Sequence, residues 1–223
     1  MLGKLKSVMF WKTREKSKEL LETTLSESKK YLEKSFNYLD KCIEIHEDNI
    51  ENDFSRIFGF TTVKAKNYGH ALYSLTLDGL AQDGSALLRN MIEAYELMVY
   101  FNLDPKRVKE AIENDLPSAG NIGKEIEGHF KNIREYLNNH GSHFSYSEHS
   151  LSHLIDWKTI EFKKFQTVSG DVLKTNIRTL NSILNLQCAE AITSLSVIGY
   201  DNSELGEDYN KHHQNFIAFN KKN

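Results

Sequence analysis

Apolar residues recur every three or four positions along most of this 223-residue chain. That spacing places them on one face of an α-helix, whereas a strand would require alternation. The two longest stripes cover residues 13–46 and 171–198. Only two prolines, Pro105 and Pro117, occur to interrupt them. The sequence therefore predicts an all-α fold, a multi-helix antiparallel bundle with long first and last helices.

Shorter helices are predicted between the two long ones. They cover residues 49–60, 65–80, 86–101, 104–114, 118–139 and 146–156. The stretch 157–168 alternates between polar and apolar residues, and there we expect an irregular connection with at most a minor hairpin. We expect a single bundle domain over residues 1–199 and a loosely ordered tail over residues 200–223, where apolar anchors are few.

The composition limits the classes of function. The net charge is −3, which gives no global attraction to nucleic acid. No run approaches the roughly 20 apolar residues of a transmembrane helix, and the apolar pieces at the N-terminus are too short for a secretory signal. The expected location is therefore the cytoplasm. Residues 1–18 carry six basic side chains and one acidic one, which suits either an amphipathic patch on an anionic membrane or, as we prefer, a solubilised start of a helix.

The two cysteines, Cys42 and Cys188, lie in apolar stripes of different predicted helices. We interpret them as reduced core residues and not as a disulfide or metal pair.

Four of the nine histidines fall within fourteen residues. They are His140, His143, His149 and His153. A helix would place His149 and His153 on one face, and imidazoles at these spacings could bind Zn²⁺ or a similar divalent ion. The competing interpretation is a set of turn and capping residues in a polar loop, with no cofactor, and we favour this second interpretation. We expect all four histidines to line one shared surface.

A second motif joins Arg134 to His140. An arginine followed by a histidine after four to six residues is the signature of a group of helical bacterial ribonucleases. In such a pair the guanidinium would stabilise phosphorane charge, and the imidazole would move the proton of the 2′-hydroxyl. The structural alternative is an exposed arginine on a charged helix face followed by a polar helix end.

A third candidate is the pair formed by Arg89 and Glu93. Their spacing of four puts both on one face of an otherwise apolar helix. We expect a largely buried, mutually paired bridge, whose disruption would cost about 3–5 kcal/mol; a polar pocket is the alternative.

Three segments carry a resemblance to a known family. They are LLRNMIE at 87–93, LPSAGNIGK at 116–124 and YLNNHGSHFS at 136–145. They resemble segments of helical bacterial proteins that are in turn similar to the HEPN group of helical nucleotide- and RNA-associated domains. The resemblance covers residues 70–150 and implies a helical bundle, a homodimer and an RNA or nucleotide ligand. At position 135 this chain carries glutamate, where the ribonuclease members usually carry Asn, Asp or His after the arginine.

Three functions follow from these motifs. The leading hypothesis is a non-catalytic intracellular binding protein, whose ligand is another protein or a nucleotide or RNA, with Arg89, Glu93 and His143 as candidate binding residues. The second is a metal-independent endoribonuclease of HEPN type, with Arg134 and His140 as catalytic residues. The third is a metal-binding protein that uses His143, His149 and His153.

Overall fold

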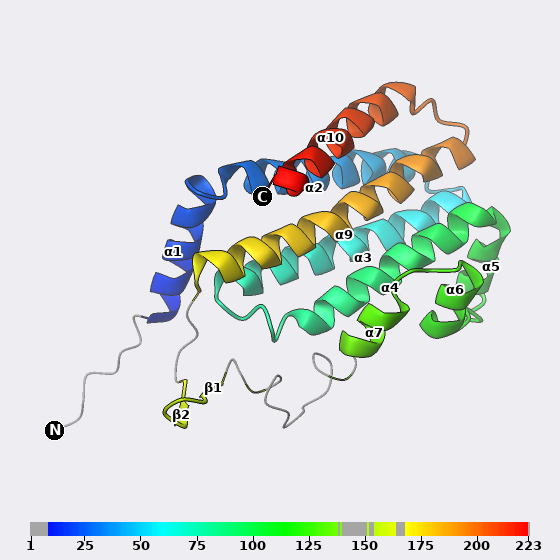
Figure 1. Cartoon of the computed structure of the whole chain (residues 1–223). Coiled ribbons are helices and arrows are strands. Elements are labelled where there is room, and N and C mark those ends of the chain that lie inside the picture. The colour runs from blue at the N-terminus through cyan, green and yellow to red at the C-terminus, as the bar shows by residue number, and fades with distance from the viewer. Residues whose placement is uncertain (1–8, 138, 140–150, 152–153, 164–167, 223) are drawn as a thin grey trace.

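The computed structural model describes residues 9–137, 139, 151, 154–163 and 168–222 (Figure 1). Helices account for 78% of these residues, so the all-α prediction is confirmed. Among the described residues, no helix combines the length and the apolarity that crossing a membrane requires.

The main helices differ widely in length. They are α1 (Met9–Glu22), α2 (Ser26–Asp48), α3 (Asp53–Leu77), α4 (Ser85–Leu103), α5 (Val108–Ile112), α6 (Ala119–Glu125), α7 (Lys131–Leu137), α9 (Gly170–Val197) and α10 (Ser203–Lys222). A short 3₁₀ turn, Pro105–Arg107, precedes α5. Two short strands, β1 (Ile155–Asp156) and β2 (Glu161–Phe162), pair antiparallel.

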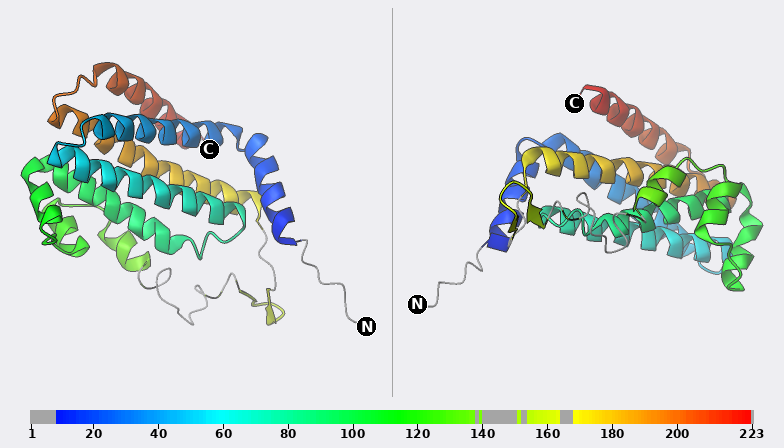
Figure 2. Two further views of the ribbon diagram at one scale, coloured as in Figure 1. Left: turned by 180° about the vertical axis from the view of Figure 1, so that it is seen from behind. Right: turned by 60° about the horizontal axis from the view of Figure 1, so that its bottom comes forward.

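Four long helices, α2, α3, α4 and α9, lie side by side and form the centre of the molecule (Figures 1 and 2). Helix α10 packs over α2 and α9, and α1 lies across one end against α2, α3 and α9. The short helices α6 and α7 pack against α4. Their placement leaves α4 between the other long helices and the segment 116–137.

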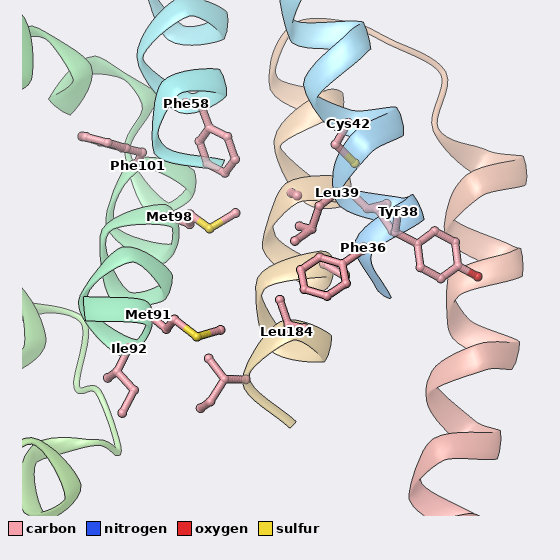
Figure 3. Packing of buried hydrophobic residues seen from close by; sticks show 14 of the residues in the cluster. Phe36, Tyr38, Leu39, Cys42, Phe58, Met91, Ile92, Met98, Phe101 and Leu184 are labelled. Atoms are coloured by element: carbon pink, nitrogen blue, oxygen red, sulfur yellow. The ribbon is translucent and has the colours of Figure 1, made fainter. Parts of the chain in front are cut away.

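The core lies where the four long helices meet (Figure 3). Leu39, Phe58, Met98 and Leu184 are completely buried there, and each such burial stabilises the fold by about 1.5–3 kcal/mol. Cys42 and Cys188 are free and buried in the same cluster, as predicted.

The predicted helix over residues 13–46 is wrong in its continuity, because α1 ends at Glu22 and α2 begins at Ser26. At the break the backbone bonds change register, because the N–H of Leu25 donates to the carbonyl of Leu20, five residues back, and the N–H of Ser26 donates to the carbonyl of Thr23. The break lets Leu21 and Leu25 both enter a second apolar cluster with Leu173 and Ile177.

The opposite error occurs at Gly59, which was expected near a helix end. Helix α3 runs without interruption from Asp53 to Leu77, and the side chain of Asn52 caps its start by accepting from the backbone N–H groups of Phe54 and Ser55. A Cβ on Gly59 would lie 3.2 Å from the Cβ of His46. This glycine therefore serves close packing of α3 on α2.

Residues 118–139 were also expected to form one helix, and that prediction is wrong. Ser118 does cap a helix, by accepting from the N–H of Asn121, but α6 ends at Glu125 and the chain turns before α7. In the turn, Glu127 adopts φ of 52° and the N–H of Gly128 donates to the carbonyl of Gly123. This turn brings α7 back onto α4.

The expected loosely ordered tail is wrong as well, since Ser203–Lys222 forms α10. Tyr209, His212 and Phe216 share one buried face of this helix. Tyr31 of α2 contacts the rings of His212 and Phe216, and the Tyr38 hydroxyl donates to Asp208. A few aromatic anchors therefore fix a helix that is polar over most of its length.

The stretch after residue 154 contains the only strands among the described residues. Ile155 pairs with Phe162, which agrees with the expected minor hairpin. The helix predicted over residues 146–156 is contradicted at its end, where Ile155 and Asp156 form β1; its first part lies outside the described residues.

Candidate functional site

The central feature of the candidate site is a buried ion pair between Arg134 of α7 and Glu96 of α4. The Nη1 atom of Arg134 donates to Oε2 of Glu96 at 2.6 Å and to the carbonyl oxygen of Ala119 at 2.8 Å. Only 8% of Arg134 and 1% of Glu96 are exposed. The pair therefore joins α7, α4 and the start of α6.

Two glycines give this ion pair its space. A Cβ on Gly123 would lie 2.4 Å from Nη2 of Arg134, and a Cβ on Gly128 would lie 2.9 Å from Oε1 of Glu96. Both separations are too short for a real Cβ to occupy without displacing a member of the pair. Helix α6 and the turn after it are thus fitted closely around the two charges.

The electrostatics of Glu96 reflect its surroundings. Burial raises the pKa of the Glu96 carboxyl, the Arg134 guanidinium opposes that rise, and Glu93 adds to it. The Oε1 atom of Glu96 is buried and has no hydrogen-bond partner. Without Arg134, a carboxyl in this position would be a buried and uncompensated charge.

Two cavities flank this ion pair. The first, which we name the aromatic cavity, has a volume of about 420 Å³ and lies between α3, α4 and the start of α6. It is lined by Phe60, Thr61, Lys64, Tyr68, Asn90, Glu93, Ala94, Glu96, Leu97, Leu116, Pro117, Ala119 and Ile122. Phe60 is 59% exposed at its edge, and the Lys64 ammonium lies 5.9 Å from the centre of the Tyr68 ring.

The second, which we name the polar cavity, has a volume of about 470 Å³ and lies between α4, α6 and α7. It is lined by Arg89, Glu93, Ala119, Gly120, Gly123, Lys124, Glu127, Gly128, Lys131, Arg134 and Glu135. Glu93 and Ala119 line both cavities, so the two adjoin each other at these residues.

The predicted pair between Arg89 and Glu93 forms, with Nε of Arg89 donating to Oε1 of Glu93 at 2.9 Å. The expected burial is only partial, because the side chains are 34% and 26% exposed. Both groups line the polar cavity, where solvent reaches them.

The remaining charges of the polar cavity are weakly engaged. Lys131 and Glu135 approach only to 4.0 Å and are mostly exposed. Lys124 and Glu127 make no ion pair with any described residue. A bound molecule could therefore form ion pairs with these groups without breaking contacts that stabilise the fold.

The predicted histidine site cannot be placed. His140, His143, His149 and His153 lie outside the described residues, and so does the partner that the ribonuclease motif assigns to Arg134. Within the described part of the chain, no group of three or more His, Cys, Asp or Glu side chains is arranged to hold a metal ion.

Sequence reasoning missed Glu96 as the partner of Arg134. The available signal was a glutamate within the most apolar helical stretch, at a position that must face the interior if its neighbours do. Gly123 and Gly128 carried no comparable signal, because glycine in a sequence marks a turn as readily as a close approach.

A separate buried polar group lies between α2 and α9. Ser194 donates to the carbonyl of Ala191, so Nε2 of His46 donates to the Ser194 hydroxyl at 2.8 Å. Burial lowers the pKa of His46 to about 4, which keeps the ring neutral. The Nδ1 atom of His46 and the hydroxyl of Ser55 are buried without a hydrogen-bond partner, and both residues line a smaller cavity of about 170 Å³.

No protein-family model, curated protein or solved structure matches this chain.

Proposed function

We propose that this chain is a non-catalytic binding protein and that its ligand occupies the aromatic and polar cavities. The observation that carries the proposal is the ion pair of Arg134 with Glu96. This buried pair joins α4 to α7 and so holds the walls of the two open cavities in place.

The engagement of Arg134 argues against a role in cleavage. A catalytic cation has to face the reacting phosphate and stabilise charge that develops there. The guanidinium of Arg134 is instead nine-tenths buried, balanced by the carboxylate of Glu96 and covered by Gly123. Its charge is already used by the fold.

The dimensions and lining of the cavities support binding. Ligand pockets in proteins commonly measure about 300–1,000 Å³ and combine apolar walls with a few polar groups. Each cavity falls in this range, and the apolar walls of the first adjoin the charged groups of the second. Arg89 and Glu93, which the sequence singled out as candidate binding residues, lie at the polar side of this site.

A fragment screen by ligand-observed NMR tests the proposal. Gly120 lines the polar cavity, and a Cβ there would meet nothing within 4 Å, so Gly120→Leu should occupy part of the cavity and obstruct a ligand there without disturbing the fold. Gly206→Leu in α10 is the matched control, because its Cβ also enters open space. We expect fragments that bind the wild type and the control but not Gly120→Leu. Binding that survives Gly120→Leu would contradict the location of the site.

A metal-independent endoribonuclease is the competing proposal and requires Arg134 together with His140. Incubating the purified protein with single-stranded RNA and a chelator distinguishes the two. We expect no cleavage. Cleavage that disappears in a folded Arg134→Lys or His140→Ala variant would overturn the non-catalytic proposal.

The wider expectations from the sequence stand as further proposals. We propose an antiparallel bundle related to the HEPN domains over residues 70–150, which forms a homodimer in the cytoplasm and could take an RNA or nucleotide ligand. Light scattering that reports a strict monomer at high concentration would contradict the dimer. A metal bound through His143, His149 and His153 would appear in elemental analysis of the purified protein.

A further inference from the structure

We infer that the ligand is a zwitterion with an apolar or aromatic body, of which an aromatic α-amino acid is the simplest representative. This inference rests on the proposed function, because it assigns a chemical class to the ligand of the same two cavities.

The charges that face the polar cavity are balanced. Arg134 is neutralised by Glu96 behind it. The others form two sets of three, the cations Arg89, Lys124 and Lys131 and the carboxylates Glu93, Glu127 and Glu135. A ligand with only negative groups would meet three carboxylates, and one with only positive groups would meet three cations. A molecule that carries both signs a few ångströms apart is complementary to both sets.

The groups with unused bonding capacity are also of both signs. Lys124 and Glu127 have no ion-pair partner among the described residues, and they lie three positions apart, Lys124 in the last turn of α6 and Glu127 in the turn that follows. Arg89 is engaged with Glu93 through its Nε atom. An ammonium and a carboxylate group of one ligand can therefore each find an opposite charge.

The aromatic cavity suits the apolar part of such a ligand. Phe60 and Tyr68 supply rings, and Leu97, Leu116 and Ile122 supply aliphatic walls. An aromatic side chain packed against these groups gains both apolar burial and ring contacts.

The junction between the cavities determines how one molecule could occupy both. Ala119 is the residue of α6 that lines both cavities, and its side chain is a single methyl group. Glu93 lines the junction from α4. A ligand that crosses this junction can thus place its charged end in the polar cavity and its ring in the aromatic cavity.

Isothermal titration calorimetry with L-phenylalanine and two neutralised derivatives tests this inference. N-acetyl-L-phenylalanine lacks the ammonium group, and L-phenylalanine amide lacks the carboxylate. We expect L-phenylalanine to bind and each derivative to bind at least tenfold more weakly. We also expect Lys124→Met to weaken L-phenylalanine binding about tenfold, whereas Lys109→Met, at an exposed position of α5 outside both cavities, changes it less than twofold.

The outcomes separate the inference from the proposed function. Equal binding of L-phenylalanine and its derivatives overturns the zwitterion assignment. So does an absence of L-phenylalanine binding, and in both cases the cavity site stands if fragments still bind and are excluded by Gly120→Leu. If Gly120→Leu excludes neither fragments nor L-phenylalanine while its thermal unfolding matches the wild type, both the inference and the proposed function fail.

Discussion

At the scale of single residues, two ion pairs of the same chemistry differ because of where they lie. Arg89 and Glu93 are neighbours on one helix and remain partly exposed. Arg134 and Glu96 lie 38 positions apart on different helices and are almost completely buried. Spacing along the sequence predicts the first kind of pair, whereas the second depends on a turn that the periodicity does not reveal.

Arg89→Ala should have a small effect on stability, because solvent reaches and screens this partly exposed pair. We expect a loss of less than about 1 kcal/mol in the free energy of unfolding, and a fall of at most about 2–4 °C in Tm. Differential scanning calorimetry measures this directly. A loss of about 3 kcal/mol or more would show that the pair is as buried as the sequence suggested.

Two glycines of α6 offer a matched comparison. Gly123→Ala inserts a Cβ against the Arg134 guanidinium and should lower the free energy of unfolding by about 1–3 kcal/mol. Gly120→Ala meets nothing and should raise it by about 0.5–1 kcal/mol, because alanine favours the helix. Urea denaturation of both variants measures the difference. Equal effects would mean that the ion pair does not require glycine at position 123.

At the scale of helices, what the sequence predicts depends on the kind of signal. The long apolar stripe predicted the range of α9 to within one residue at each end, because a 3.6-residue period that continues over many turns is compatible only with a helix. The ends of α1, α3 and α6 could not be predicted this way, since tertiary packing decides them. Leu25, Gly59 and Gly128 each lie at a contact with another helix, and helix propensity along the sequence does not predict such contacts.

Two buried histidines should make the helix packing sensitive to pH. Burial lowers the pKa of His46 and of His212 to about 4, with Lys34 lowering that of His212 further and Asp208 opposing it. Between about pH 4 and 6.5 the unfolded chain therefore binds more protons than the folded chain. The contribution of these histidines to the free energy of unfolding is complete above about pH 6.5 and is lost as the pH falls toward 4. At pH 5 each histidine should account for a loss of about 2 kcal/mol.

Chemical denaturation at pH 5 and pH 7 of the wild type and of His212→Gln checks this expectation. Burial raises the pKa of Glu96 and of Glu190, so protonation of these carboxyl groups favours the folded chain as the pH falls. Both proteins contain these two groups, so the difference between the proteins reports on His212. The variant should lose less stability than the wild type between pH 7 and pH 5. An identical loss in both proteins would show that His212 is not held in its neutral form.

At the scale of the whole molecule, the four long helices and the segment 116–137 have different roles. The four long helices bury the core, and their apolar stripes make the all-α fold predictable. The candidate site forms where α6 and α7 return to the outer face of α4 (Figure 1). Some of its charged groups could be identified from the sequence, as Arg89, Glu93 and Arg134 were. The partner of Arg134 and the two cavities could not, because they form only when the turn after α6 brings α7 back onto α4.

The central claim is that Arg134 is the structural partner of Glu96, and a double-mutant cycle tests it most directly. The free energy of unfolding is measured for the wild type, Glu96→Leu, Arg134→Met and the double variant. Each single change leaves one buried charge uncompensated and should cost about 3–5 kcal/mol. The double variant should lose at least about 2 kcal/mol less than the sum of the two single losses. Losses that add to within about 0.5 kcal/mol would show that the two groups do not support each other, and would contradict the account.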